Sequence, residues 1–230
     1  MRTTRPDVMA LLLAAVLVVA ACDQKTETPA KDPAKAEARF PYPNDPEMQK
    51  RAPDVFKVRF VTSDGDFVVE AHRQWAPIGV DRFYNLVQNG FYDDTRIFRV
   101  EPPFVVQFGI SGKPEISVDW FEATIRDEPV RQKNLEGTVT FAKTQQAHSR
   151  TTQIFVNLGD NSSLDMRGFS PFGRVVEGMA VIEGMMPTSE ADPLGMNRKP
   201  DQGMIKGLGN RYLDSTFPKL CRIRSAKVEK

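Results

Sequence analysis

Short apolar stretches recur through the second part of the chain, and in the first of them apolar and polar residues alternate. Phe56, Val58 and Phe60 alternate with basic residues. A turn at residues 63–66 leads into a second apolar run, and together they predict a β-hairpin. Further short apolar stretches predict strands over residues 95–100, 104–108, 137–143, 152–158, 172–178 and 219–228.

Helical spacing is limited to two stretches. Apolar residues recur at helical intervals from Val80 to Val87, and an Asn-Gly pair follows as a typical stop. The spacing predicts a helix of about ten residues that starts near Pro77. A second, short helix is predicted over residues 179–185.

Two segments show neither pattern. Residues 110–136 and 187–217 are rich in Pro, Gly and charged residues, and we expect them to form long irregular loops. Many short strands with only two helices indicate a mainly β fold, built as a closed antiparallel barrel.

The N-terminus has the pattern of an export signal. An arginine-containing start precedes an apolar stretch at residues 8–19, which ends in Ala20, Ala21 and Cys22. The stretch is shorter than the roughly 20 residues of a membrane-spanning helix. We expect a signal peptide over residues 1–21. The cleavage region resembles a bacterial lipobox, with Cys22 as the lipidated first residue of an exported, membrane-anchored protein facing the periplasm or the cell exterior. An ordinary secretory signal with an incidental cysteine is the alternative.

A change of composition marks the start of the folded domain. Residues 22–54 are rich in Lys, Glu, Pro and Ala and poor in apolar residues, which is typical of a disordered tether. The domain would then comprise residues 55–230. The later part of the tether, residues 39–46, carries two aromatic residues and could instead dock on the domain.

Charge and motifs exclude several functions. The formal net charge is +1, and no basic block is interleaved with aromatic residues, so we expect no nucleic-acid partner. Neither a phosphate-binding glycine loop nor a dinucleotide fingerprint is present. His72 and His148 are far apart in the sequence, and no His/Cys spacing is typical of a metal site.

Four motifs, in the same order, resemble the cyclophilin family. GFYDDTRIFRV with FVVQFG (residues 90–109), GTVTFAK (137–143), SRTTQIFVNLGDNSSLD (149–165) and FSPFGRVVEGMAVIEGM (169–185) are similar to the family's signature stretches. The resemblance spans roughly residues 56–185. It implies an eight-stranded antiparallel barrel capped by two helices, and peptidyl-prolyl cis/trans isomerase activity.

The resemblance also implies the site. Arg99 would favour the twisted X–Pro amide as a hydrogen-bond donor, and Gln107 would hold its guanidinium. Because resonance alone must be weakened, no cofactor and no metal are expected. The partners would be proline-containing unfolded or flexible protein segments, bound by a monomer that assists the folding of exported proteins. The implied substrate-binding residues are Phe104, Val105, Ala142, Lys143, Gln153, Phe155, Leu164 and Phe169.

Two other functions fit parts of the pattern. Taken alone, Arg99 would be a surface or salt-bridge residue, and the phenylalanines would be core residues. A non-catalytic chaperone module that binds proline segments needs only the apolar slot, whereas this chain also keeps Arg99 and Gln107. A barrel carrying a small apolar ligand would require a large empty lumen.

Two residues depart from the family pattern. They are Phe98, where a histidine is usual, and Val105, where a methionine is usual.

Overall fold

The alternating stretch forms the expected hairpin. The computed structural model describes residues 39–229. Within it, β1 (Val55–Thr62) and β2 (Asp66–His72) pair antiparallel. Phe60 and Phe67 are cross-strand partners, and their rings stack with centroids 4.8 Å apart. The hydrophobic face of this hairpin therefore starts the core.

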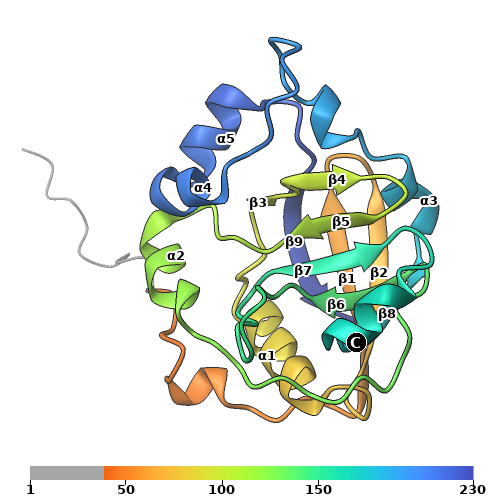
Figure 1. Cartoon of the computed structure of the whole chain (residues 1–230). Coiled ribbons are helices and arrows are strands. Elements are labelled where there is room, and N and C mark those ends of the chain that lie inside the picture. The colour runs from red at the N-terminus through yellow and green to blue at the C-terminus, as the bar shows by residue number, and fades with distance from the viewer. Residues whose placement is uncertain (1–38, 230) are drawn as a thin grey trace, which may run out of the picture. The chain divides into compact units, whose positions relative to one another are not determined.

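The described strands form one curled antiparallel sheet, shown in Figure 1. Its nine strands lie in the order β3-β9-β1-β2-β8-β6-β7-β5-β4. The remaining bounds are β3 (Thr95–Arg96), β4 (Arg99–Glu101), β5 (Val105–Phe108), β6 (Thr138–Phe141), β7 (Ile154–Asn157), β8 (Pro171–Glu177) and β9 (Arg222–Val228). The prediction of a mainly β antiparallel fold is confirmed.

The expected count of eight strands in a closed barrel needs correction. The stretch predicted as one strand, 95–100, is divided, because its first part pairs with β9 and its last part with β5. These two parts, β3 and β4, are the edges of the sheet. The two edge strands, β3 and β4, do not pair with each other. Ile97 and Phe98 join them covalently, so the sheet curls round without being closed by hydrogen bonds.

The described chain contains more helix than the sequence predicts. The α-helices are α1 (Pro77–Gln88), α2 (Pro114–Phe121), α3 (Met179–Glu183), α4 (Gln202–Leu208) and α5 (Asn210–Thr216), and the 3-10 helices are η1 (Pro46–Met48), η2 (Ser162–Arg167) and η3 (Thr188–Glu190). The predictions of α1 and α3 are confirmed. The expectation of two helices and two long loops is wrong, because α2, α4 and α5 lie in those loops. Each has only seven or eight residues, too few for a clear apolar period.

An acidic side chain from elsewhere in the sequence caps α1. The Glu128 carboxylate accepts the backbone N–H groups of Ile78 (2.6 Å) and Gly79 (3.0 Å). The same carboxylate pairs with Arg150 at 3.0 Å, and both side chains are at least 95% buried. A buried ion pair therefore fixes the start of the helix that covers the core.

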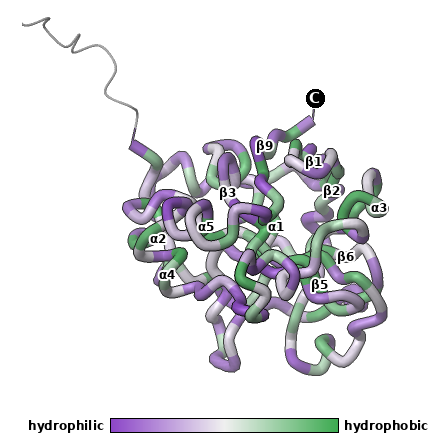
Figure 2. The backbone as a smooth tube through the Cα atoms, turned by 90° about the horizontal axis from the view of Figure 1, so that it is seen from above, coloured by the Kyte–Doolittle hydropathy of each residue, from purple (hydrophilic) through white to green (hydrophobic). Residues whose placement is uncertain are grey.

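Aromatic side chains fill the inside of the curled sheet. Phe60, Phe83 and Phe172 belong to one large buried cluster, with the Phe83 and Phe172 rings 4.9 Å apart. Figure 2 shows hydrophobic residues along α1 and α3, which pack against the sheet. Because side chains occupy this space, the hypothesis of a ligand-carrying lumen finds no support among the described residues.

A second buried cluster joins α4 and α5 to the sheet. Phe98 packs with Ile205 of α4 and Leu213 of α5, and all three are at most 3% exposed. This packing gives Phe98 a structural role where the family pattern has histidine.

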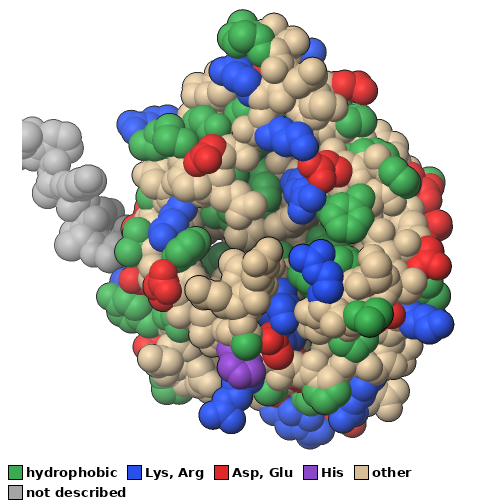
Figure 3. All heavy atoms as spheres, viewed as in Figure 1, with side chains coloured by type: hydrophobic (Ala, Val, Ile, Leu, Met, Phe, Trp, Pro, Cys, Tyr) green, Lys and Arg blue, Asp and Glu red, His purple; other side chains and the backbone are tan. Residues whose placement is uncertain are grey.

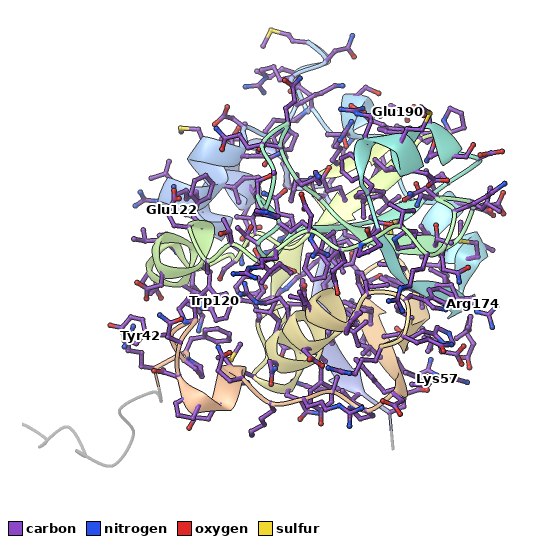
Figure 4. All side chains as sticks on the ribbon, turned by 60° about the horizontal axis from the view of Figure 1, so that its bottom comes forward. Tyr42, Lys57, Trp120, Glu122, Arg174 and Glu190 are labelled. Carbon is purple, nitrogen blue, oxygen red and sulfur yellow. The ribbon has the colours of Figure 1, made fainter. Side chains whose placement is uncertain are left out.

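The folded unit begins earlier than predicted. It starts at Arg39. Phe40 lies against Trp120, with ring centroids 5.9 Å apart, and the Trp120 indole N–H donates to the Pro41 carbonyl at 3.1 Å. Figure 4 shows Trp120 on the same side of the molecule as Tyr42. Residues 39–54 are therefore not a free tether, and the docking alternative describes them correctly.

The other N-terminal predictions lie outside the described residues. These are the signal peptide at residues 1–21, lipidated Cys22 and the first part of the tether. In residues 39–229, no helix has both the length and the apolar character needed to cross a bilayer.

Candidate active site

Strand alternation sends two sets of side chains to opposite faces of the sheet. In β5, Val106 and Phe108 point into the core, so Val105 and Gln107 point outward. Gln107 is the cross-strand partner of Arg99 in β4 and of Phe155 in β7. These strands lie side by side at the front of Figure 1. Register alone thus brings a cation, an amide and an aromatic ring together.

The Arg99 guanidinium is held by two acceptors. Nη1 donates to Gln107 Oε1 at 3.0 Å, and Nη2 donates to Glu101 Oε2 at 2.6 Å. The Arg99 Cζ atom lies 5.5 Å from the centroid of the Phe104 ring. A guanidinium carries five N–H donors, so donors remain for a bound molecule. With 35% of the side chain exposed, those donors are accessible from solvent.

Both acceptors belong to longer polar chains. Gln107 Nε2 donates to Gln153 Oε1 at 2.8 Å, and Gln153 Nε2 donates to Gln202 Oε1 at 3.1 Å. On the other side, Lys199 Nζ donates to Glu101 Oε1 at 2.5 Å. Hydrogen bonds from Arg99 and then from Lys199 hold the pKa of Glu101 below its usual range. Glu101 therefore stays ionised as the counter-ion of the arginine.

An apolar pocket lies beside the guanidinium. Val105, Phe155 and Leu164 form its floor and are each at most 4% exposed. Phe169 packs edge-on against Phe155, with centroids 5.9 Å apart. Phe104 and Ala142 pack around the same cluster. The pocket is a separate cluster from the main core, as expected for a site on the outer face of the sheet.

Asparagine amides hold the segment that carries Leu164 and Phe169. Asn134, fully buried, donates from Nδ2 to Asp165 Oδ1 at 2.7 Å and to the Phe169 carbonyl at 2.9 Å. Asn161 Nδ2 donates to the Phe104 carbonyl at 2.8 Å. The pocket rim is thus tied to the sheet by hydrogen bonds, which preorganises it for an apolar ring.

The opposite wall comes from the segment between β5 and β6. Phe121, the last residue of α2, lines the cleft and is 49% exposed, whereas its neighbour Trp120 is buried and packs the segment. Lys143 Nζ pairs with Asp127 at 3.1 Å and lies 5.8 Å from the Phe169 ring centroid. The Lys143 cation is therefore neutralised locally, and the backbone of residues 142–143, directly after β6, lies beside the cleft.

The whole arrangement is one open cleft of about 660 Å³. Figure 3 shows basic side chains next to an acidic one near the middle of the hollowed face. Its lining includes every residue predicted for the site: Arg99, Phe104, Val105, Gln107, Ala142, Lys143, Gln153, Phe155, Leu164 and Phe169. The structure thus brings all ten of these residues together in one cleft.

Three residues of this arrangement, Glu101, Lys199 and Gln202, are not among the residues predicted for the site. Glu101 is visible in the sequence only as a charge beside an apolar strand, and Lys199 and Gln202 stand in a segment predicted as loop. No local signal could have joined Lys199 to Glu101, because 98 positions separate them. No group of three or more His, Cys, Asp or Glu residues in the described range is arranged to hold a metal ion.

The sheet and cleft define a mainly β domain with a peptide-sized polar–apolar site on its outer face. A family model described as cyclophilin type peptidyl-prolyl cis-trans isomerase matches residues 57–207, and the chain belongs to this family. The family prediction, and with it the prediction of an enzyme of this class, is confirmed.

Known proteins agree with this membership. The chain is 35% identical over 136 residues to peptidyl-prolyl cis-trans isomerase A of Dickeya dadantii, covering 55% of this chain and 68% of the relative. It is 34% identical over 134 residues to peptidyl-prolyl cis-trans isomerase B of Escherichia coli, covering 55% and 81%. A Cryptosporidium parvum cyclophilin crystallised in the presence of the dipeptide Ala-Pro has a TM-score of 0.54 at 19% identity, covering 76% of this chain and 99% of that one. This last likeness shows the shared fold.

Proposed function

We propose that this protein catalyses cis/trans isomerisation of X–Pro peptide bonds in flexible protein segments. The observation that carries the proposal is the position of Arg99, whose guanidinium is fixed by Gln107 and Glu101 beside the pocket floored by Val105 and Phe155. A cation with free donors next to a ring-sized apolar slot meets the requirements of this reaction.

The chemistry needs little else. Rotation about a peptide bond costs ~18–20 kcal/mol because resonance gives the C–N bond double-bond character. In the proposed mechanism, the apolar pocket holds the proline ring while the residue before it rotates. Arg99 donates a hydrogen bond that favours the pyramidal prolyl nitrogen of the twisted state. A donor fixed before the reaction stabilises the transition state without reorganisation, and such donors contribute several kcal/mol.

The remaining proposals concern where the protein acts. The pattern of residues 1–22 supports an exported lipoprotein, anchored through Cys22 and facing the periplasm or the cell exterior. The substrates would be exported proteins, and the enzyme would act as a monomer. Mass analysis of the membrane fraction should find an N-terminal diacylated Cys22, since two acyl chains anchor stably. An unmodified chain in the soluble fraction would exclude the anchor.

A prolyl-peptide isomerisation assay with the purified protein tests the proposed function. We expect saturable acceleration over the uncatalysed reaction, which takes tens to hundreds of seconds. Binding of the same peptide should be measured in parallel. Binding without acceleration would identify a non-catalytic chaperone module on the same fold.

A further inference from the structure

The short segment 199–202 reaches Arg99 from two sides. Its first residue, Lys199, donates to Glu101, which accepts from Arg99 Nη2. Its last residue, Gln202, accepts from Gln153 at the far end of the amide chain that begins at Arg99 Nη1. The segment thus completes a ring of polar contacts around the guanidinium.

The hydrogen bonds of the amide chain all run in the same direction, from Arg99 to Gln202. Arg99 donates to the oxygen of Gln107, and Gln107 and Gln153 each accept on the oxygen and donate from the nitrogen to the next amide. Aligned hydrogen bonds polarise one another, so the last acceptor, Gln202, strengthens the first bond. Without Gln202, the outer amide Gln153 would lose the acceptor that fixes its orientation.

The segment is itself rigidly held. The Asp192 side chain is fully buried and pairs with Arg198 at 2.7 Å, directly before Lys199. Asp201 caps α4 by accepting the Met204 N–H at 2.8 Å, directly before Gln202. The helix that follows is anchored in the cluster around Phe98. Both ends of the segment are therefore fixed independently of Arg99.

We propose that residues 199–202 form a positioning strap for Arg99, with Glu101, Lys199 and Gln202 as positioning residues of the isomerisation reaction. An arginine side chain has large rotamer freedom, and holding it by both terminal nitrogens removes that freedom before the substrate arrives. Glu101 occupies one side of the guanidinium and leaves other donors free, so the strap orients the cation and does not block it. The inference rests on the proposed function.

The test measures kcat and KM of the full chain on a short proline peptide, with thermal melts of every variant. Lys199→Met and Gln202→Leu should each lower kcat about twofold to fivefold, and Glu101→Gln about threefold to tenfold, with KM unchanged. Lys199→Arg keeps the cation and should retain activity. Lys219→Met, which changes another exposed lysine, is the matched control and should behave as the wild type.

A positioning role requires that these effects vanish without Arg99. In an Arg99→Ala background, Lys199→Met and Glu101→Gln should change the residual rate no further. Nitrogen-15 NMR of the Arg99 guanidinium should show slowed rotation in the wild type and faster rotation in Lys199→Met. These two readouts do not respond to a general loss of stability.

The outcomes distinguish a failure of the proposed strap from a failure of the proposed isomerase function. A wild-type protein that binds the peptide without accelerating isomerisation overturns both. An active wild type with variants that match Lys219→Met, or with losses that persist in the Arg99→Ala background, overturns the strap alone. Faster turnover in Lys199→Met would also overturn it, because the strap would then restrain catalysis.

Discussion

Replacement of Arg99 by alanine should remove catalysis and leave the fold intact. The side chain lies outside the core clusters and is 35% exposed. Its contact with Glu101 is a partly exposed ion pair, and such pairs contribute at most about 1 kcal/mol to stability. The variant should therefore unfold within a few degrees of the wild type.

The expected catalytic loss is larger than the stability loss. Removing one preorganised donor costs ~2.7–4 kcal/mol of transition-state stabilisation, or about 10²–10³ in kcat. KM should change little, because the pocket around Phe155 holds the proline ring independently of the guanidinium. Arg99→Lys should recover little, since an ammonium cannot donate from two fixed directions while Gln107 and Glu101 are also satisfied.

The assay is prolyl-peptide isomerisation kinetics with thermal melts and peptide binding for each variant. Arg174→Ala is the matched control, because Arg174 is an exposed strand arginine that also pairs with a glutamate, Glu70, at 3.5 Å. If Arg99→Ala unfolds the domain, the arginine is structural. If it stays folded and turns over at the wild-type rate, the catalytic assignment fails and the chaperone alternative takes its place.

Three further outcomes follow from pocket, core and charge. Phe155→Ala should raise KM at least about tenfold by removing the aromatic floor of the pocket, as measured in the same assay. Arg150→Leu should lower the free energy of unfolding in urea by about 3–5 kcal/mol, because it leaves the Glu128 carboxylate buried without its cation. A urea midpoint equal to that of the wild type would refute this. The pKa of Glu101 is lowered chiefly by the hydrogen bond from Arg99, so its stabilising effect is present above the ordinary glutamate range and is lost as pH falls through the lowered value. In Glu101→Gln, the free energy of unfolding should fall less steeply with pH in this acidic range. An unchanged pH dependence would contradict the ion pair.

The sequence predicted the strands well because they are short apolar runs bounded by turn residues, and in β1 buried positions also alternate with more exposed ones. β1, β2 and β5 to β9 lie within or close to the predicted ranges. The ten residues predicted for the site lie together, because the motifs that carry them fall on strands and turns around one cleft. The division of the predicted strand 95–100 could not be predicted, since its first part pairs with β9 and its last part with β5 only in the folded chain.

Helices and boundaries that depend on distant partners could not be predicted. The aromatic Phe40 allows docking of residues 39–46, but only the folded chain brings Phe91 and Trp120 together as the surface on which it packs. The short helices α4 and α5 bury Ile205 and Leu213 against Phe98, which is more than 100 positions away in the sequence. Local propensity carries no information about such contacts.

The reaction itself explains why the site is hard to recognise from single residues. Twisting an amide requires no nucleophile, no metal and no proton transfer, so each component has an ordinary structural use elsewhere. Arg99 is an ion-paired strand residue, and Phe155 is a buried ring. What distinguishes them is their combination on one outer face, where Gln107 is the cross-strand partner of both. A one-residue insertion or deletion before β5 that shifts its register by one position would send Gln107 into the core and Val106 into the cleft. In the proposed mechanism, catalysis therefore depends on the register of three neighbouring strands as much as on the identity of the residues.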